Sequence, residues 1–197
     1  TNWMGGDPLL NTFIGGPEIE LARLVFHELS HQVAYASDDT TFNESFATAV
    51  ERIGGARWLA SHASDKAREE YAVFDGRRQD FRAFTMGWRE RLDALYRSGA
   101  SDAAKRTHKA ELMAQMRSEY ETMKRERWSG FSGYDGWFAR ANNAAFGVLA
   151  AYNALVPAFE RLFERSGRDF ERFYAEVKRL AALPKAERRA ALASIGD

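Results

Sequence analysis

The sequence predicts a mainly α-helical protein, and two patterns in it support that prediction. Apolar and aromatic residues recur at helix-like intervals through two long charged segments, residues 63–97 and 102–128. Clusters of glycine and serine separate the periodic segments, notably at 54–55, 98–101 and 129–136. We therefore expect helices joined by short loops.

The N-terminal part is expected to begin with a loop that leads into a helix. Residues 1–16 are rich in glycine and carry a proline, which predicts a loop with a short strand or turn near residues 9–14. Pro17 suits the first position of a helix, because its missing N–H has no partner there in any case. This first helix should run to about Ala36.

A second helix should follow after a short break. Residues 37–40 are polar side chains that compete for backbone hydrogen bonds, and Thr41 can cap the helix after them. We expect this helix to end at about Ile53, because Gly54 and Gly55 come next.

The remaining helices form a hairpin and a C-terminal group. The two charged segments predict long helices joined at 98–101 as an antiparallel hairpin. An apolar helix is expected from Trp137 to about Arg165, bent or stepped at Pro157, with Asn142 and Asn143 inside it. A further helix and a short tail helix should follow. The expected divisions, within one compact domain, are 1–62 for the first helices, 63–128 for the hairpin, and 129–197 for the C-terminal helices that pack on them.

Composition excludes several classes of function. Lysine plus arginine (28) balances aspartate plus glutamate (28), so we expect no nucleic-acid partner. Without cysteine, a metal must be held by His, Asp or Glu. The longest apolar stretch, residues 144–159, is too short and too interrupted to span a membrane. The chain starts at Thr1 without a signal segment, so we expect a fragment or processed form of a longer protein.

One motif predicts a metal site. His27-Glu28-Leu29-Ser30-His31 is a His-Glu-x-x-His sequence inside the first expected helix. Residues four apart share a helix face, with Cβ atoms about 5–6 Å apart, so both imidazoles can reach one zinc ion. Glu28 lies beside them, where a general base is needed. The alternative is that His27 and His31 are two ordinary histidines on a helix. The chain has only 4 histidines, so this spacing would rarely arise by chance.

Two glutamates on the second helix are candidates for completing the site. Glu44 can be the third ligand if the chain folds back after the first helix, but Thr41-x-x-Glu44 is also a capping box. Glu51 lies on the same helix face as Glu44 and could accept a hydrogen bond from the second ring N–H of a ligand histidine. An exposed surface charge is the alternative for Glu51.

The segment from His27 through the second helix resembles a known family. HELSH followed by FNESFATAVE is similar to gluzincin metallopeptidases. The longer stretch from Asp7 to Leu59 resembles bacterial predicted zinc aminopeptidases, and this resemblance runs on through residues 142–144. The resemblance implies a zincin-like pair of helices, zinc ligands His27, His31 and Glu44, base Glu28, and Glu51 as the outer glutamate. It further implies a peptide or aminoacyl substrate and a bacterial cell-envelope or periplasmic location.

Other groups could complete the reaction. Tyr134 and Tyr152, with Tyr35 as a further possibility, are candidates for donating a hydrogen bond to the developing oxyanion. Asn142 and Asn143 could bind the substrate backbone or tie down the loop at 130–136. His62 and His108 are expected to face solvent.

Three functions compete at this point. An aminopeptidase is favoured by the resemblance. The best-known zinc aminopeptidases bind the substrate amino terminus with a Gly-x-Met-Glu-Asn motif, and this sequence lacks it. An endopeptidase would use the same chemistry in an open cleft. A helical binding module with a structural zinc would need a fourth ligand, such as Asp38 or Asp39.

Overall fold

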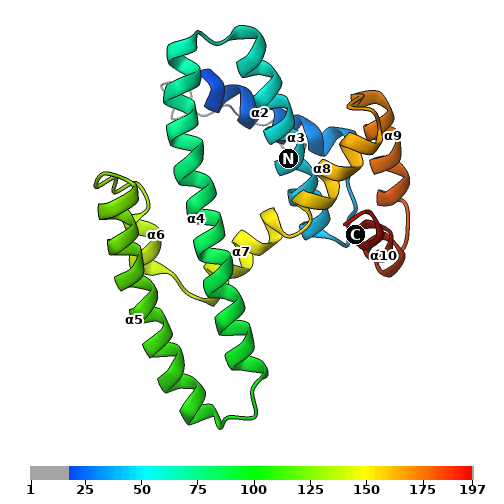
Figure 1. Ribbon diagram of the computed structural model, residues 1–197. Helices are drawn as coiled ribbons and strands as arrows, with labels where there is room; N and C mark the ends of the chain where they lie inside the picture. Colours follow the sequence, from blue (N-terminus) through cyan, green and yellow to red (C-terminus); the bar gives the residue numbers. More distant parts are fainter. Residues whose placement is uncertain (1–17, 197) are drawn as a thin grey trace, which may run out of the picture. The chain divides into compact units, whose positions relative to one another are not determined.

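The protein is helical throughout the part that the computed structural model describes, residues 18–196 (Figure 1). This confirms the predicted mainly α class. The loop expected at 1–16, the strand or turn near 9–14 and Pro17 lie outside the described residues. The helices are α2 (Glu18–Val33), α3 (Thr40–His62), α4 (Asp65–Arg97), α5 (Asp102–Arg127), α6 (Asp135–Arg140), α7 (Asn143–Asn153), α8 (Val156–Arg165), α9 (Phe170–Ala181) and α10 (Lys185–Gly196).

The chain divides into two compact units. Of the described residues, the first unit comprises 18–68 together with 151–196, and the second unit comprises 69–150. Residues 129–150 therefore group with the hairpin, whereas 151–196 group with α2 and α3. Each unit has its own hydrophobic core.

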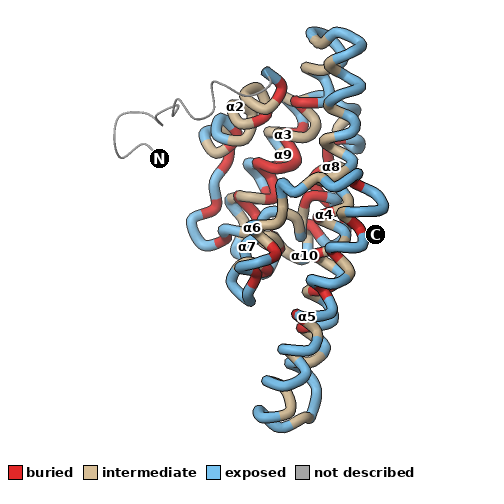
Figure 2. The backbone as a smooth tube through the Cα atoms, turned by 90° about the vertical axis from the view of Figure 1, so that its left-hand side faces the viewer, coloured by how far each residue is buried: buried red, intermediate tan, exposed pale blue. Residues whose placement is uncertain are grey.

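The core of the first unit is built around α3. Phe42 and Phe46 are fully buried, and both rings contact that of Phe159 on α8, at centroid distances of 5.2 and 5.7 Å. Phe173 and Leu180 of α9 and Leu192 of α10 complete this core. Much of α3 is accordingly coloured as buried in Figure 2. Helix α3 is therefore a rigid support for any side chain that it carries.

The prediction that Gly54 and Gly55 end the second helix is wrong, because α3 continues through them to His62. Both glycines are buried against α2. A Cβ atom at Gly54 would lie 2.8 Å from Cδ2 of Phe26, and one at Gly55 would lie 2.9 Å from Cγ of Arg23. The pair therefore permits close approach of two helices and does not terminate one.

The predicted hairpin is present in the second unit. Helices α4 and α5 are joined at 98–101, and Asp80 of α4 accepts hydrogen bonds from Arg127 (2.8 Å) and from Nε1 of Trp128 (3.0 Å). Aromatic rings fill the core of this unit, with Phe138 stacked on Tyr120 at 3.8 Å. Along α5 most residues are exposed, as Figure 2 shows, and only one face carries buried positions.

The single bent helix expected from 137 to 165 is wrong, because α6, α7 and α8 occupy this stretch. Asn142 does not lie inside a helix. Its Oδ1 accepts a hydrogen bond from the N–H of Ala145 (3.1 Å), which is the contact of a residue that caps the start of α7. Pro157 lies in the first turn of α8, where its missing N–H is tolerated.

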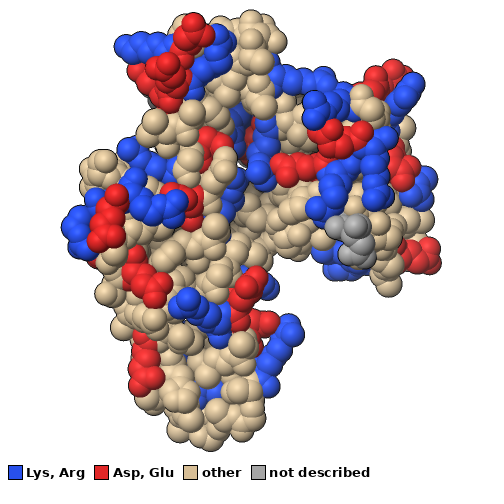
Figure 3. Space-filling view, viewed as in Figure 1, with Lys and Arg blue, Asp and Glu red and all other residues tan. Residues whose placement is uncertain are grey.

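The surface carries charges of both signs. On the face drawn in Figure 3, basic and acidic side chains are interspersed, as the equal numbers of each in the sequence suggest. Among the described residues, no helix is long and apolar enough to cross a membrane.

Candidate metal centre

Helix α2 carries both histidines of the motif on one face. His27 and His31 lie one turn apart, and their ring centroids are 5.2 Å apart with the planes at 79°. Ser30 lies between the two histidines in the sequence and is buried, and its hydroxyl donates a hydrogen bond to the carbonyl of His27 (2.6 Å). The Ser30 hydroxyl is thereby satisfied within the helix.

The chain then reverses direction and places Glu44 opposite the histidines. Asn43 fixes the reversal, because its side chain accepts a hydrogen bond from the N–H of Ala36 and donates one to the carbonyl of Ala36, both at 2.8 Å. Asp39 caps α3 by accepting from the N–H of Phe42 (3.1 Å). The prediction that Thr41 caps this helix is therefore wrong, and the alternative in which Glu44 completes a capping box with Thr41 falls with it.

Three donor atoms converge at this point. Nε2 of His27 lies 3.4 Å from Oε2 of Glu44, and Nε2 of His31 lies 4.0 Å from the same oxygen. One ligand atom from each of the three residues lies within 4.8 Å of the others. Two ligands of a tetrahedral zinc, each about 2.1 Å from the ion, lie about 3.4 Å apart. The spacing of the donors thus fits a small divalent cation.

The hydrogen bonding of these residues also fits a cation. Oε2 of Glu44 is buried and has no hydrogen-bond partner among the described residues. A buried carboxylate oxygen without a partner is costly, and a bound cation would compensate it. The side chains of His27, His31 and Glu44 are 12%, 21% and 19% exposed, so the centre is shielded but still reachable from solvent.

Glu51 makes the contact that a ligand histidine requires. Its Oε2 lies 3.2 Å from Nδ1 of His27, and its Oε1 accepts hydrogen bonds from Nε (2.9 Å) and Nη2 (2.6 Å) of Arg23. Glu51 is therefore neither an exposed surface charge nor a candidate ligand. A carboxylate in contact with Nδ1 can orient a histidine and fix its tautomer, and the predicted outer role of Glu51 stays a prediction.

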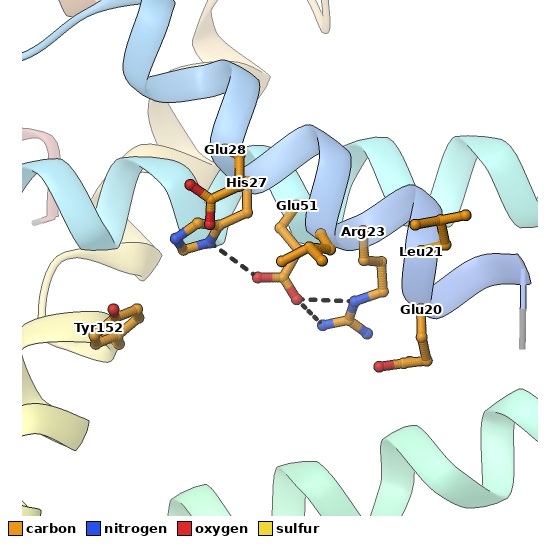
Figure 4. Close-up of a pocket in the computed structure, with 8 residues that line it drawn as sticks. Glu20, Leu21, Arg23, His27, Glu28, Glu51 and Tyr152 are labelled. Carbon is orange, nitrogen blue, oxygen red and sulfur yellow. Dashed lines mark hydrogen bonds and ion pairs between the residues drawn. The ribbon is translucent and has the colours of Figure 1, made fainter. Parts of the chain in front are cut away.

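A pocket opens beside the centre. It has a volume of about 380 Å³, and Figure 4 shows His27 and Glu28 from α2, Glu51 from α3 and Tyr152 from α7 around it. The Tyr152 ring stacks on that of His27 at 5.9 Å and 16°. Glu28 is exposed to solvent there. A substrate in this pocket would meet the Glu28 carboxylate and the His27 ring together.

The charges around the pocket shift the protonation of its side chains. Burial lowers the pKa of His27, but the hydrogen bond and charge of Glu51 outweigh it, so this pKa is raised above its ordinary value. For His31, burial prevails and lowers the pKa. Burial, together with the charge and hydrogen bond of Glu44, raises the pKa of Tyr152. The Tyr152 hydroxyl therefore keeps its proton at neutral pH.

The other residues predicted for the site are distributed between the units. Tyr134 lies in the second unit, stacked on Phe81 at 4.1 Å, and Asn143 of that unit exchanges hydrogen bonds with the hydroxyl of Tyr96. Their roles, like that of Asn142, stay predictions. In the first unit, Tyr35 is 64% exposed, and its ring lies 6.5 Å from that of His31.

Sequence reasoning missed Arg23. It lies four residues before His27, so it shares the face of α2 that carries the ligands, and this spacing is the signal that could have indicated it. His62 and His108 are exposed, as expected.

The fold and the site define a helical protein with a candidate three-donor metal centre. The chain belongs to the protein family described as "Putative aminopeptidase", whose sequence profile matches residues 2–192. No curated protein and no solved structure gives a significant match to this chain.

Proposed function

We propose that this chain is a zinc-dependent aminopeptidase that hydrolyses peptide or aminoacyl amides. One observation is the main support for the proposal: Nε2 of His27, Nε2 of His31 and Oε2 of Glu44 converge within 4.8 Å. They do so beside the pocket that Glu28 lines, in a chain that belongs to an aminopeptidase family.

Each site residue has a distinct role in the proposed reaction. His27, His31 and Glu44 would hold the ion, and zinc bound there supplies a Lewis acid that lowers the pKa of a water molecule and polarises the scissile carbonyl. Glu28 accepts the proton of the attacking water at its carboxylate and later donates it to the nitrogen of the leaving amine.

Tyr152 is the proposed hydrogen-bond donor to the substrate. Its ring stacks on His27, and its raised pKa, caused by burial and then by Glu44, keeps the hydroxyl protonated at neutral pH. The hydroxyl can therefore donate to the carbonyl oxygen as negative charge develops on it.

The contacts of the two aspartates argue against a structural zinc with four protein ligands. Asp39 caps α3 and pairs with Arg189 and Arg188, and Asp38 also pairs with Arg188 at 3.0 Å. Both of the aspartates that were candidates for a fourth ligand are thus engaged elsewhere. Three protein ligands leave a coordination position open, which is the arrangement of catalytic zinc sites.

Metal analysis combined with a Glu28→Gln variant tests the proposal. We expect about one zinc per chain in both proteins, and a loss of aminoacyl-amide hydrolysis by a factor of about 10²–10⁴ in the variant, because only the base is removed. Glu18→Gln, an exposed carboxylate at the start of α2, is the matched control and should hydrolyse normally. Cleavage of the free but not the N-acetylated substrate would separate an aminopeptidase from an endopeptidase.

A zinc titration of further variants tests the third ligand. Glu44→Ala should weaken zinc binding far more than Glu51→Ala, because changes outside the ligand shell typically cost about 10–100-fold. Absence of zinc from the wild-type protein, or undiminished hydrolysis by Glu28→Gln, would disprove the proposed function.

A further inference from the structure

Arg23 is a buried cation that the proposed chemistry does not use. Its side chain is 4% exposed, and it lies on α2 one turn before His27. Removing a guanidinium from water is energetically costly, and burying an ion pair often fails to offset that cost in stability. A buried arginine next to a candidate catalytic centre therefore needs an explanation other than stability.

The contacts of Arg23 lead directly to a proposed ligand. Both Nε (2.9 Å) and Nη2 (2.6 Å) donate to one oxygen of Glu51, Oε1. The other oxygen of the same carboxylate, Oε2, faces Nδ1 of His27 at 3.2 Å. Figure 4 shows Glu51 lying between the two side chains. A glutamate held at both oxygens has little freedom to rotate, so Arg23 fixes the acceptor that His27 meets.

The packing of α3 leaves room for this arrangement. A Cβ atom at position 55 would lie 2.9 Å from Cγ and 3.4 Å from Cδ of Arg23, so glycine there lets the arginine stem lie against α3. A nearby ion pair between α3 and α8 is different. Arg52 and Glu160 lie 3.2 Å apart, but their side chains are 32% and 36% exposed, as expected of an ordinary surface contact.

We propose that Arg23 is a positioning residue that acts through Glu51. By fixing Glu51, it keeps the proton of His27 on Nδ1 and directs the lone pair of Nε2 toward the point where the three donor atoms converge. The inference rests on the proposed metal centre, but the state of the His27 ring can be measured without metal. Lysine could supply the charge but not the paired donors of the planar guanidinium.

The first test is the tautomer of His27 in metal-free protein, read from imidazole nitrogen shifts of histidine labelled with ¹⁵N. At a pH well above the raised pKa of His27, where the ring is neutral, the wild type should carry the proton on Nδ1. Arg23→Met should give a mixture of tautomers, and Arg23→Lys should restore the Nδ1 form in part. Arg52→Met is the matched control, because it removes an arginine from a Glu pair beside Glu51, and its His27 spectrum should equal that of the wild type.

The second test is zinc affinity in a double-mutant cycle. Arg23→Met should weaken zinc binding by about 10–100-fold, whereas adding it to Glu51→Ala should cause no further loss if its effect on the centre passes through Glu51. If Arg23→Met does not fold, Arg23→Lys takes its place in the cycle. Additive losses, or a wild-type tautomer in the folded Arg23 variant, would overturn the inference. A changed tautomer in a protein that never binds zinc would instead uphold it and disprove the proposed function.

Discussion

Asp39 shows how one residue can support the loop that carries Glu44 to the centre. Its side chain is 1% exposed and accepts hydrogen bonds from the N–H of Phe42 (3.1 Å), from Nη1 of Arg188 (3.1 Å) and from Nε of Arg189 (2.8 Å). Arg188 is itself buried, and its guanidinium also donates to the carbonyls of Leu180 (3.3 Å) and Leu183 (2.8 Å). One carboxylate thus joins the start of α3 to α10.

This network should make the folding stability depend on pH. Burial raises the pKa of Asp39, but hydrogen bonds from Arg189 and Phe42 outweigh it, so the pKa lies below its ordinary value. A carboxyl with a lowered pKa in the folded state stabilises fully above the unfolded-state pKa, and loses its contribution as the pH falls through the folded-state pKa. Asp39→Asn, which can still cap the helix, isolates the contribution of the charge.

We expect Asp39→Asn to lower the free energy of unfolding at pH 7 by an amount on the order of 3 kcal/mol, because Arg188 keeps a buried charge with fewer partners. The difference from the wild type should shrink below about pH 4, the ordinary aspartate pKa. Urea unfolding of both proteins between pH 7 and pH 3 measures it. A difference that stays constant with pH would show that the charge of Asp39 does not matter.

At the scale of helices, the sequence predicted the segments that depend on local pattern. The hairpin and the His-Glu-x-x-His helix follow from periodicity and spacing, which act within one helix. The errors arose where a tertiary contact decides the outcome. Gly54 and Gly55 indicate a helix end only until Phe26 and Arg23 are known to pack against them.

The same limit applied to the candidate site. The convergence of His27 and His31 could be predicted, since one turn of helix fixes it. The position of Glu44 depends on the reversal that Asn43 stabilises through Ala36, a contact that no spacing rule indicates. Arg23 was missed because a charged residue on a helix is usually solvated, and only the α2–α3 packing buries it.

Because α2 and α3 pack closely, a glycine-to-alanine change should lower stability at their contact and raise it elsewhere. Gly55→Ala gains about 1 kcal/mol of helix propensity, but it must displace Arg23 Cγ from 2.9 Å, and such overpacking typically costs about 1–3 kcal/mol. We therefore expect a net loss of stability. Gly87→Ala in α4 meets no atom within 4 Å and should stabilise by about 1 kcal/mol.

Urea unfolding of Gly55→Ala and Gly87→Ala shows whether each change lowers or raises the free energy of unfolding. Gly54→Ala, whose Cβ would meet Phe26 at 2.8 Å, should resemble Gly55→Ala in stability but leave the Arg23–Glu51 contact intact. Stabilisation by Gly55→Ala equal to that by Gly87→Ala would mean that the α2–α3 packing is looser than the structure indicates.

At the scale of the whole chain, the two units have separate cores. The proposed site uses residues of the first unit alone, and the aromatic core of the second contributes none of its three donors. The chain passes from one unit to the other within α4 and within α7. Two cores of this kind predict that stability is lost in parts, since a cavity disturbs chiefly the residues that line it.

Hydrogen exchange of the amides can test this division with one large-to-small substitution in each core. Phe138 is 2% exposed and contacts Tyr120 and Phe81, while Phe159 is fully buried against Phe42 and Phe46. Either phenylalanine-to-alanine change should cost about 3–5 kcal/mol. Exchange should then accelerate by at least about 10²-fold within the unit that carries the substitution, because about 1.4 kcal/mol corresponds to a factor of ten.

The pattern of acceleration separates two kinds of folding behaviour. If the units open independently, Phe138→Ala should accelerate exchange in α5 and leave α3 and α8 within about twofold of the wild type, and Phe159→Ala should do the reverse. Amides of α4 and α7 near the division belong to neither set, because these helices run through it. Equal acceleration of both units by either substitution would show instead that the chain unfolds as one cooperative body, and that the core of the second unit sustains the proposed site through stability alone.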